Sequence, residues 1–345
     1  MREKRLDFEL LRLLAIFGVV FNHTQLRGFE LYQLSAGGFN YWASLVLGIL
    51  CKMAVPLFLL VSGGLLLHRE EPLSLVLKKR AGRILGALVL FSLVLYLFWT
   101  VWGWIEAPGI GDFFFRLFHE GISAPYWYLY AYLGLMLMLP LLRPMVQHMP
   151  DKAFLYLLVL HLMIWGVFGA LGSLLGWGAL NEDLFLPVIE PTLFYFLMGY
   201  CMAHRLDLNR LRGKMGFLWI ASVFSILLTL FLSHLEIRLE GTPGEYLRFL
   251  MAVPILTLYI SAARLFAGRR PPRWAETALT GLGGCVFGTY LLEGILRHYL
   301  SPVYEALEPK IHVLPACLIW VIAVALCGLG ITWVLKKLPL LRKLL

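Results

Sequence analysis

The sequence predicts an all-α, polytopic integral membrane protein with about ten transmembrane helices. Of its 345 residues, 60% are hydrophobic and only 15% are charged, and the mean hydropathy is +0.78. A soluble domain is roughly 45–50% apolar and about 25% charged. A chain of this length has no interior large enough to hide so much apolar surface from water. The excess is therefore expected to face lipid.

Apolar windows long enough to cross a bilayer recur along the chain, joined by short connections. The first window follows a basic start, but Arg12 interrupts it and no small-residue cleavage site follows, so it is expected to be a retained span. No separate soluble domain is evident, and residues 1–345 are expected to form a single transmembrane domain. In chain order the windows cover residues 8–26, 41–67, 82–102, 126–146, 153–175, 187–204, 216–234, 246–266, 276–300 and 313–335.

The distribution of positive charge predicts the orientation. If the N-terminus is cytoplasmic, most of the 30 basic residues fall in inner connections, including clusters at 78–83, 205–214, 264–273 and 336–343. Basic residues concentrate on the cytoplasmic side of membrane proteins, so both termini are expected to be cytoplasmic. This placement also explains the net charge of +9 without nucleic acid, because no basic run is interleaved with aromatic residues.

Metal and disulfide chemistry are not expected. The five cysteines all lie in apolar stretches and none forms a CxxC pair, so they are expected to be small buried hydrophobic residues. The histidines and acidic residues show no metal-ligand spacing either.

The first window carries polar residues where lipid does not tolerate them. Arg12 and His23 are separated by almost three helical turns, which places both on one helix face roughly 16 Å apart. Glu9 lies three residues before Arg12 and is expected to pair with it. A snorkelling arginine and a hydrogen-bonded core histidine would also explain these residues one by one, but their shared face favours a functional stripe.

Arg80 and Arg83 begin the third window within a basic cluster. Residues three apart share a helix face, and two guanidinium groups so placed can bind a phosphate or pyrophosphate bidentately. The alternative is an ordinary positive-inside cluster.

Further polar residues lie in or beside other windows. The second window is interrupted by Pro56 and a glycine pair, and the freed backbone requires a protein-lined cavity that Ser62 could also line. Glu190 is expected at the outer mouth of the sixth window. Glu293 lies in the middle of the ninth, where an unpaired carboxylate would be costly.

These motifs resemble the membrane acyltransferase-3 superfamily, whose bacterial members O-acylate cell-surface glycans. Arg12 and His23 are similar to its Arg-x10-His signature, and Arg80 with Arg83 resembles its Arg-x-x-Arg motif. The resemblance extends in order over most of the chain, through segments at 55–63, 126–140, 194–200 and 288–292. Many members of the family have a histidine where this chain has Glu293.

The resemblance implies transfer of an acyl group from cytoplasmic acyl-CoA, most commonly acetyl-CoA, to a hydroxyl of a surface or lipid-linked glycan in the bacterial cytoplasmic membrane. Arg80 and Arg83, helped by Arg12, would hold the donor phosphates. His23 would act as general base or carry the acyl group itself, with Glu293 as a second catalytic residue. The residues expected to contact substrate are Ser62, Tyr128 and Glu190.

Two rival functions remain open from the sequence. A transporter of small solutes, such as amino acids or acidic metabolites, would also use a broken helix and buried charges. It would not need the arginine pair to bind phosphate. A sensor or scaffold would explain the spans but not the polar stripe of the first helix.

Overall fold

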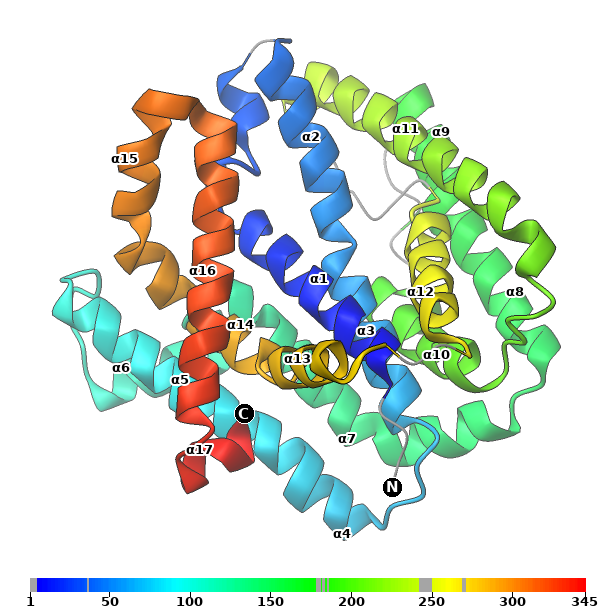
Figure 1. The fold of residues 1–345 in the computed structure, drawn as a ribbon, viewed down its shortest axis with the longest axis horizontal. Helices are drawn as coiled ribbons and strands as arrows, with labels where there is room; N and C mark the ends of the chain where they lie inside the picture. The colour runs from blue at the N-terminus through cyan, green and yellow to red at the C-terminus, as the bar shows by residue number, and fades with distance from the viewer. Residues whose placement is uncertain are drawn as a thin grey trace.

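The computed structural model describes residues 5–35, 37–177, 181, 184, 186–241, 250–268 and 271–345 (Figure 1). Every regular element within these residues is a helix. The start of the eighth window, residues 246–249, lies outside the described residues. So do several basic residues used to predict the orientation: Arg2, Lys4, Arg248, Arg269 and Arg270.

Six helical segments among the described residues are long and apolar enough to cross a membrane, and one bent pair raises the number to seven. The bent pair joins α13 (Arg273–Gly283) to α14 (Val286–Tyr299) at an angle of 56°. The first three segments are Phe39–Leu66, which holds α2 (Phe39–Lys52) and α3 (Ala54–Leu66); Leu73–Val101, with α4 (Leu73–Leu75), the π-helix η3 (Val76–Ala81) and α5 (Gly82–Val101); and Ala124–His148, with α7 (Trp127–His148). The fourth is Asp151–Leu175, with α8 (Asp151–His161), the π-helix η6 (Leu162–Phe168) and α9 (Gly169–Leu175). The last two are Arg212–Leu239, with most of α11 (Met215–Glu240), and Val313–Leu335, which is α16.

The expected count of ten spans is not confirmed, although each of the ten windows contains a helix. Three of these helices are short: α1 (Leu6–Asn22), α10 (Pro191–His204) and α12 (Ala252–Phe266) have 17, 14 and 15 residues. At 1.5 Å per residue they are about 21–26 Å long, less than the roughly 30 Å hydrocarbon core. The other described helical elements are η1 (Gln25–Arg27), η2 (Leu31–Leu34), α6 (Ile110–Phe115), η4 (Arg116–Glu120), η5 (Ala124–Tyr126), η7 (Pro187–Ile189), η8 (Arg212–Lys214), α15 (Ser301–Ile311) and α17 (Pro339–Leu344).

The short helix α1 lies inside the bundle, in contact with α2, α3, α12, α13, α14 and α16 (Figure 1). Leu11, Ile16 and Val20 on α1 are completely buried. A helix enclosed by other helices does not have to match the thickness of the bilayer, which accounts for its length. The polar residues of α1 are consequently surrounded by protein rather than lipid.

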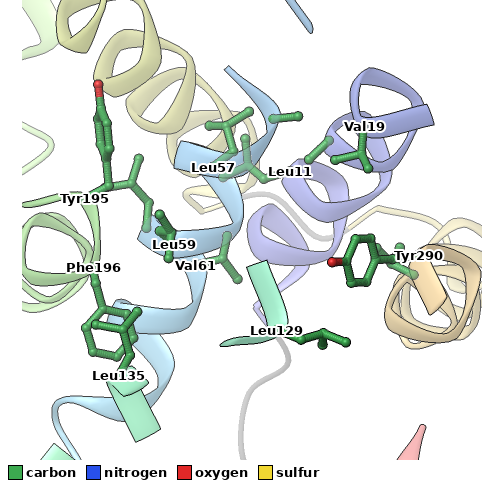
Figure 2. Close-up of a cluster of buried hydrophobic side chains, with 14 of the residues drawn as sticks. Leu11, Val19, Leu57, Leu59, Val61, Leu129, Leu135, Tyr195, Phe196 and Tyr290 are labelled. Atoms are coloured by element: carbon green, nitrogen blue, oxygen red, sulfur yellow. The ribbon is translucent and has the colours of Figure 1, made fainter. Parts of the chain in front are cut away.

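Close glycine contacts join α3 to α10. A Cβ at Gly63 would collide with the carbonyl oxygen of Phe196, and a Cβ at Gly199 would collide with the carbonyl oxygen of Leu60. Small residues at helix crossings let backbones approach closely and gain van der Waals contact within a membrane. Figure 2 shows the apolar cluster around this crossing, with side chains from α1, α3, α7, α10 and α14: Leu11, Val19, Leu57, Leu59, Val61, Leu129, Leu135, Tyr195, Phe196 and Tyr290.

The start of α1 and the end of α16 both approach the break between α13 and α14. A Cβ at Gly283, beside the break between α13 and α14, would touch the side chain of Glu9 near the start of α1. The Lys336 Nζ, just after α16, donates to the carbonyl oxygen of Gly284 at 2.8 Å. The same end of the bundle therefore contains the start of α1, the end of α16 and the break between α13 and α14.

Candidate active site

A cavity of about 460 Å³ opens where α1, the break between α2 and α3, the start of α7 and α14 meet. Of the eight residues singled out in the sequence, five line it: Arg12, His23, Ser62, Arg83 and Tyr128. The lining also includes Val19 and Tyr290, which are labelled in Figure 2. The cavity thus collects polar side chains from helices far apart in the sequence.

Two polar residues of the cavity come from α1 and the position directly after it. Arg12 and His23 both line it, as expected for residues on one helix face. The expected pairing of Arg12 with Glu9 is confirmed by hydrogen bonds of 3.1 and 3.2 Å from the guanidinium to both carboxylate oxygens. His23 is the residue immediately after α1 ends, with backbone angles outside the helical region. The helix termination therefore frees its ring to turn toward the neighbouring α14.

Glu293 and Arg297 on α14 support His23. The His23 Nδ1 lies 3.1 Å from the Glu293 Oε1, and Glu293 is only 1% exposed. Arg297 donates from Nε to the Glu293 Oε2 at 2.6 Å and from Nη1 to the His23 carbonyl oxygen at 2.7 Å. The carboxylate is therefore buried with two partners, which is the condition that makes burial of a charge acceptable.

Sequence analysis did not identify Arg297 as a site residue. The available signal was the four-residue spacing between Glu293 and Arg297, which places the two side chains on one helix face.

Arg80 and Arg83 have different partners, and only Arg83 is among the residues that line the cavity. Arg83 lines the cavity, donates to the carbonyl oxygens of Leu344 and Leu345 at 2.9 and 2.8 Å, and lies 5.6 Å from the Phe287 ring centroid. Arg80 instead contacts the Glu71 carboxylate. Arg80 belongs to the π-helical turn η3, and Arg83 to the α-helix that follows. Because a π turn holds more residues than an α turn, the three-residue spacing does not carry its usual α-helical meaning across this junction.

Glu71 sits at the centre of a separate cluster of arginines between the second and third windows. Arg80 and Arg143 both donate to its carboxylate, Arg143 at 2.8 Å, and Arg69 lies 3.7 Å away. The hydrogen bond from Arg80, together with that from Arg143, lowers the pKa of Glu71 from its ordinary 4.5 to about 2. Arg80 thus joins η3, and Arg143 joins α7, to the connection that carries Glu71.

Of the three residues expected to contact substrate, two line the cavity and one does not. Ser62 on α3 and Tyr128 on α7 line the cavity, where the Tyr128 ring stacks on Tyr132 with centroids 5.6 Å apart. Glu190 precedes α10, is exposed, and does not line the cavity.

Two tyrosine hydroxyls fix the α7 side of the cavity to α14. Tyr126 donates to the carbonyl oxygen of Leu291 at 2.7 Å, and Tyr290 donates to that of Pro125 at 2.5 Å. These bonds hold the start of α7 against the turn of α14 that precedes Glu293.

Two further polar residues, Asn22 and Lys52, also line the cavity and were not proposed as site residues from the sequence.

No group of three or more histidine, cysteine, aspartate or glutamate side chains in the described part of the chain is placed to hold a metal ion.

In comparisons with known proteins, the model of one family, described as an acyltransferase domain, matches residues 5–335. No curated protein and no solved structure matches the chain.

Proposed function

The chain belongs to the acyltransferase-3 family, and from this premise we propose that it transfers an acyl group, acetyl in the first instance, from cytoplasmic acyl-CoA to a hydroxyl of an extracytoplasmic or lipid-linked glycan. Family membership makes the chain a membrane acyltransferase and sets aside the solute transporter that the sequence alone left open. The donor, the acceptor and the role of each residue are the content of the proposal.

The observation that carries this proposal is the placement of His23 and the cavity cations. His23, backed by buried Glu293, lines the same cavity as Arg12 and Arg83. Along α1, His23 and Arg12 are roughly 16 Å apart. One cavity therefore offers positive charge at one end and a carboxylate-supported imidazole at the other.

The donor follows from this distribution. Arg83 and Arg12 would bind the phosphates of acyl-CoA, since guanidinium groups match phosphate geometry. The flexible arm of the donor would then extend along α1 and bring the thioester to His23. Because Arg83 now donates to the carbonyl oxygens of Leu344 and Leu345, phosphate binding would displace these residues. Arg80 would join only by releasing Glu71, and Glu190 would contact an acceptor only outside the cavity.

The chemistry follows from the second ring nitrogen of His23. The His23 Nδ1 lies 3.1 Å from the Glu293 Oε1, and in the neutral tautomer that carries its proton on Nδ1 the Nε2 would be the free base. It would take the proton of an acceptor hydroxyl as the oxygen attacks the thioester carbon, and CoA would leave as the thiolate. The same nitrogen would serve if His23 carried the acyl group as a covalent intermediate. Ser62 and Tyr128 would line the path of the donor arm.

The proposal also covers the setting of the reaction. The excess of basic residues in the connections on one side supports a cytoplasmic position for both termini, and the ten helix-containing windows would form one domain over residues 1–345. We place this domain in the bacterial cytoplasmic membrane, where a cytoplasmic donor and an external or lipid-linked glycan can both reach one cavity.

Calorimetry of acetyl-CoA binding to the detergent-purified chain tests the donor site. A hydrogen bond to a charged group contributes about 1.5–3 kcal/mol, so Arg83→Ala should weaken acetyl-CoA binding by about tenfold or more. Added salt should weaken acetyl-CoA binding by the unmodified chain. Arg80→Ala is the matched comparison. It should leave the affinity nearly unchanged if Arg80 only holds Glu71, and lower it equally if Arg80 also binds donor. Absence of binding by any short acyl-CoA would refute the proposed donor.

A further inference from the structure

Lys52 lies at the reacting end of the cavity. It ends α2, at the break that separates α2 from α3, and it lines the same cavity as His23. The Asn22 Nδ2 donates to the carbonyl oxygen of Cys51 at 3.1 Å, so the residues that precede His23 and Lys52 in the chain are in direct contact. The Lys52 ammonium lies 5.1 Å from the ring centroid of Phe29, in the segment that follows His23.

The cations of the cavity separate into two groups along α1. Among the described residues, three cationic side chains line the cavity, Arg12, Lys52 and Arg83, and no aspartate or glutamate side chain does. Arg12 lies in the first half of α1. Arg83 donates a hydrogen bond to Leu345. Lys52 lies beside the C-terminal end of α1 instead, where His23 is. Its charge is therefore placed away from the proposed phosphate site.

Acyl transfer creates negative charge where Lys52 is placed. As the acceptor oxygen forms a bond to the thioester carbon, the carbonyl π pair moves onto the carbonyl oxygen. The oxyanion pair then re-forms the carbonyl bond as the carbon–sulfur bond breaks. The sulfur keeps the electron pair of the broken bond, and the proton held by His23 neutralises the leaving thiolate. Donors already aimed at the developing oxyanion give the largest single contribution to many such reactions.

We propose that Lys52 is a catalytic residue that binds the thioester carbonyl oxygen and stabilises the oxyanion formed on it. The inference rests on the proposed function, because it requires the thioester to lie beside His23. Asn22 is the neighbouring polar side chain, but its amide nitrogen is already bonded to Cys51. The lysine ammonium carries three donors and a full positive charge, so it can bind the oxygen while keeping contact with the protein.

The first test measures the release of CoA thiol from acetyl-CoA by the full chain in detergent, with water as the acceptor. Lys52→Met removes the charge and nearly preserves the volume. The expected result is a kcat lower by about 10²–10³-fold with KM within about threefold, as for loss of one oxyanion donor. Lys52→Arg should retain part of the rate. Lys310→Met, at an exposed lysine of α15, is the matched control and should not change it.

The second test does not need turnover. Bound acetyl-CoA labelled with ¹³C at the carbonyl is examined by infrared difference spectroscopy. The carbonyl band should lie at lower frequency in the unmodified chain than in Lys52→Met, because the ammonium polarises the bond. If Lys52→Met does not fold, Lys52→Gln, which keeps an N–H donor but no charge, replaces it in both assays and should show an intermediate band.

The outcomes separate this inference from the proposed function. No acetyl-CoA binding by the unmodified chain would refute the donor site and with it this role. Intact binding with the same carbonyl band in both chains would overturn the Lys52 assignment alone. So would a Lys52→Met chain that turns over acetyl-CoA normally but has lost affinity for succinyl-CoA, because Lys52 would then bind a carboxylate of the acyl group.

Discussion

Replacement of Arg297 by methionine should destabilise the protein and slow transfer, because it removes one of the two partners of a buried carboxylate. Glu293 is 1% exposed, and Arg297 donates to it at 2.6 Å and to the His23 carbonyl oxygen at 2.7 Å. Loss of one member of a buried ion pair costs about 3–5 kcal/mol. A displacement of His23 by about 1 Å would lower the rate by about 10²-fold.

The assay is thermal unfolding in detergent combined with release of CoA from acetyl-CoA. The double variant Glu293→Gln with Arg297→Met removes both charges, so its stability should exceed that of Arg297→Met alone, which gives a measurable coupling energy. The control is Arg116→Met. Arg116 pairs with Asp112 at the same four-residue spacing, but both side chains are partly exposed, and such pairs contribute only about 0–1 kcal/mol.

Equal losses in Arg297→Met and Arg116→Met would refute this reasoning, because burial would then add nothing to the pair. Additive effects of the Glu293 and Arg297 substitutions would refute it as well. Stability lost without a change in rate would confine Arg297 to a structural role and leave His23 positioned by α1 alone.

Three further predictions concern other parts of the chain. His23→Ala should abolish CoA release while the protein remains monodisperse on size exclusion and its unfolding temperature changes little; loss of both would remove support for a catalytic role. Glu71 has a pKa of about 2, below its ordinary 4.5, so its stabilising contribution is complete above about pH 5 and is lost as the pH falls toward 2. Glu71→Gln should reduce the fall in unfolding temperature over that interval, and an identical acid profile would contradict the assignment. Gly63→Ala should cost about 1–3 kcal/mol or more by overpacking, because its Cβ would meet the carbonyl oxygen of Phe196. Gly134→Ala, with no atom within 4 Å of its Cβ, is the control, and equal unfolding temperatures would show that α3 and α10 can separate without cost.

Local spacing accounts for the part of the site that sequence reasoning predicted. Arg12 lies on α1 and His23 directly follows its last residue, eleven positions on, and both line one cavity; Glu9 pairs with Arg12 because it lies three residues away. Helical periodicity fixes such relations without knowledge of any neighbour. Where the local geometry departs from a regular α-helix, as in the π turn that contains Arg80, spacing alone did not indicate that Arg80 contacts Glu71 while Arg83 lines the cavity.

Contacts between distant segments required the structure. The partner of His23 is Glu293, and the residue that holds them both, Arg297, lies far along the chain on α14. The pairing of Arg80 with Glu71 and the position of Lys52 beside His23 are of the same kind. Each depends on how helices cross, and this is set by close contacts such as the one between Gly63 and Phe196.

The sequence by itself determined that the chain is helical, that it belongs in a membrane, and which residues share the face of its first helix. These properties follow from composition and from a periodicity of a few residues, both of which are local. The tertiary structure alone decided that α1 is enclosed by other helices, and that Arg83 but not Arg80 lines the cavity. It also decided that Glu293 and Arg297 contact His23 and that Lys52 lines the same cavity, because the packing of one helix against another brings together residues that no local pattern connects.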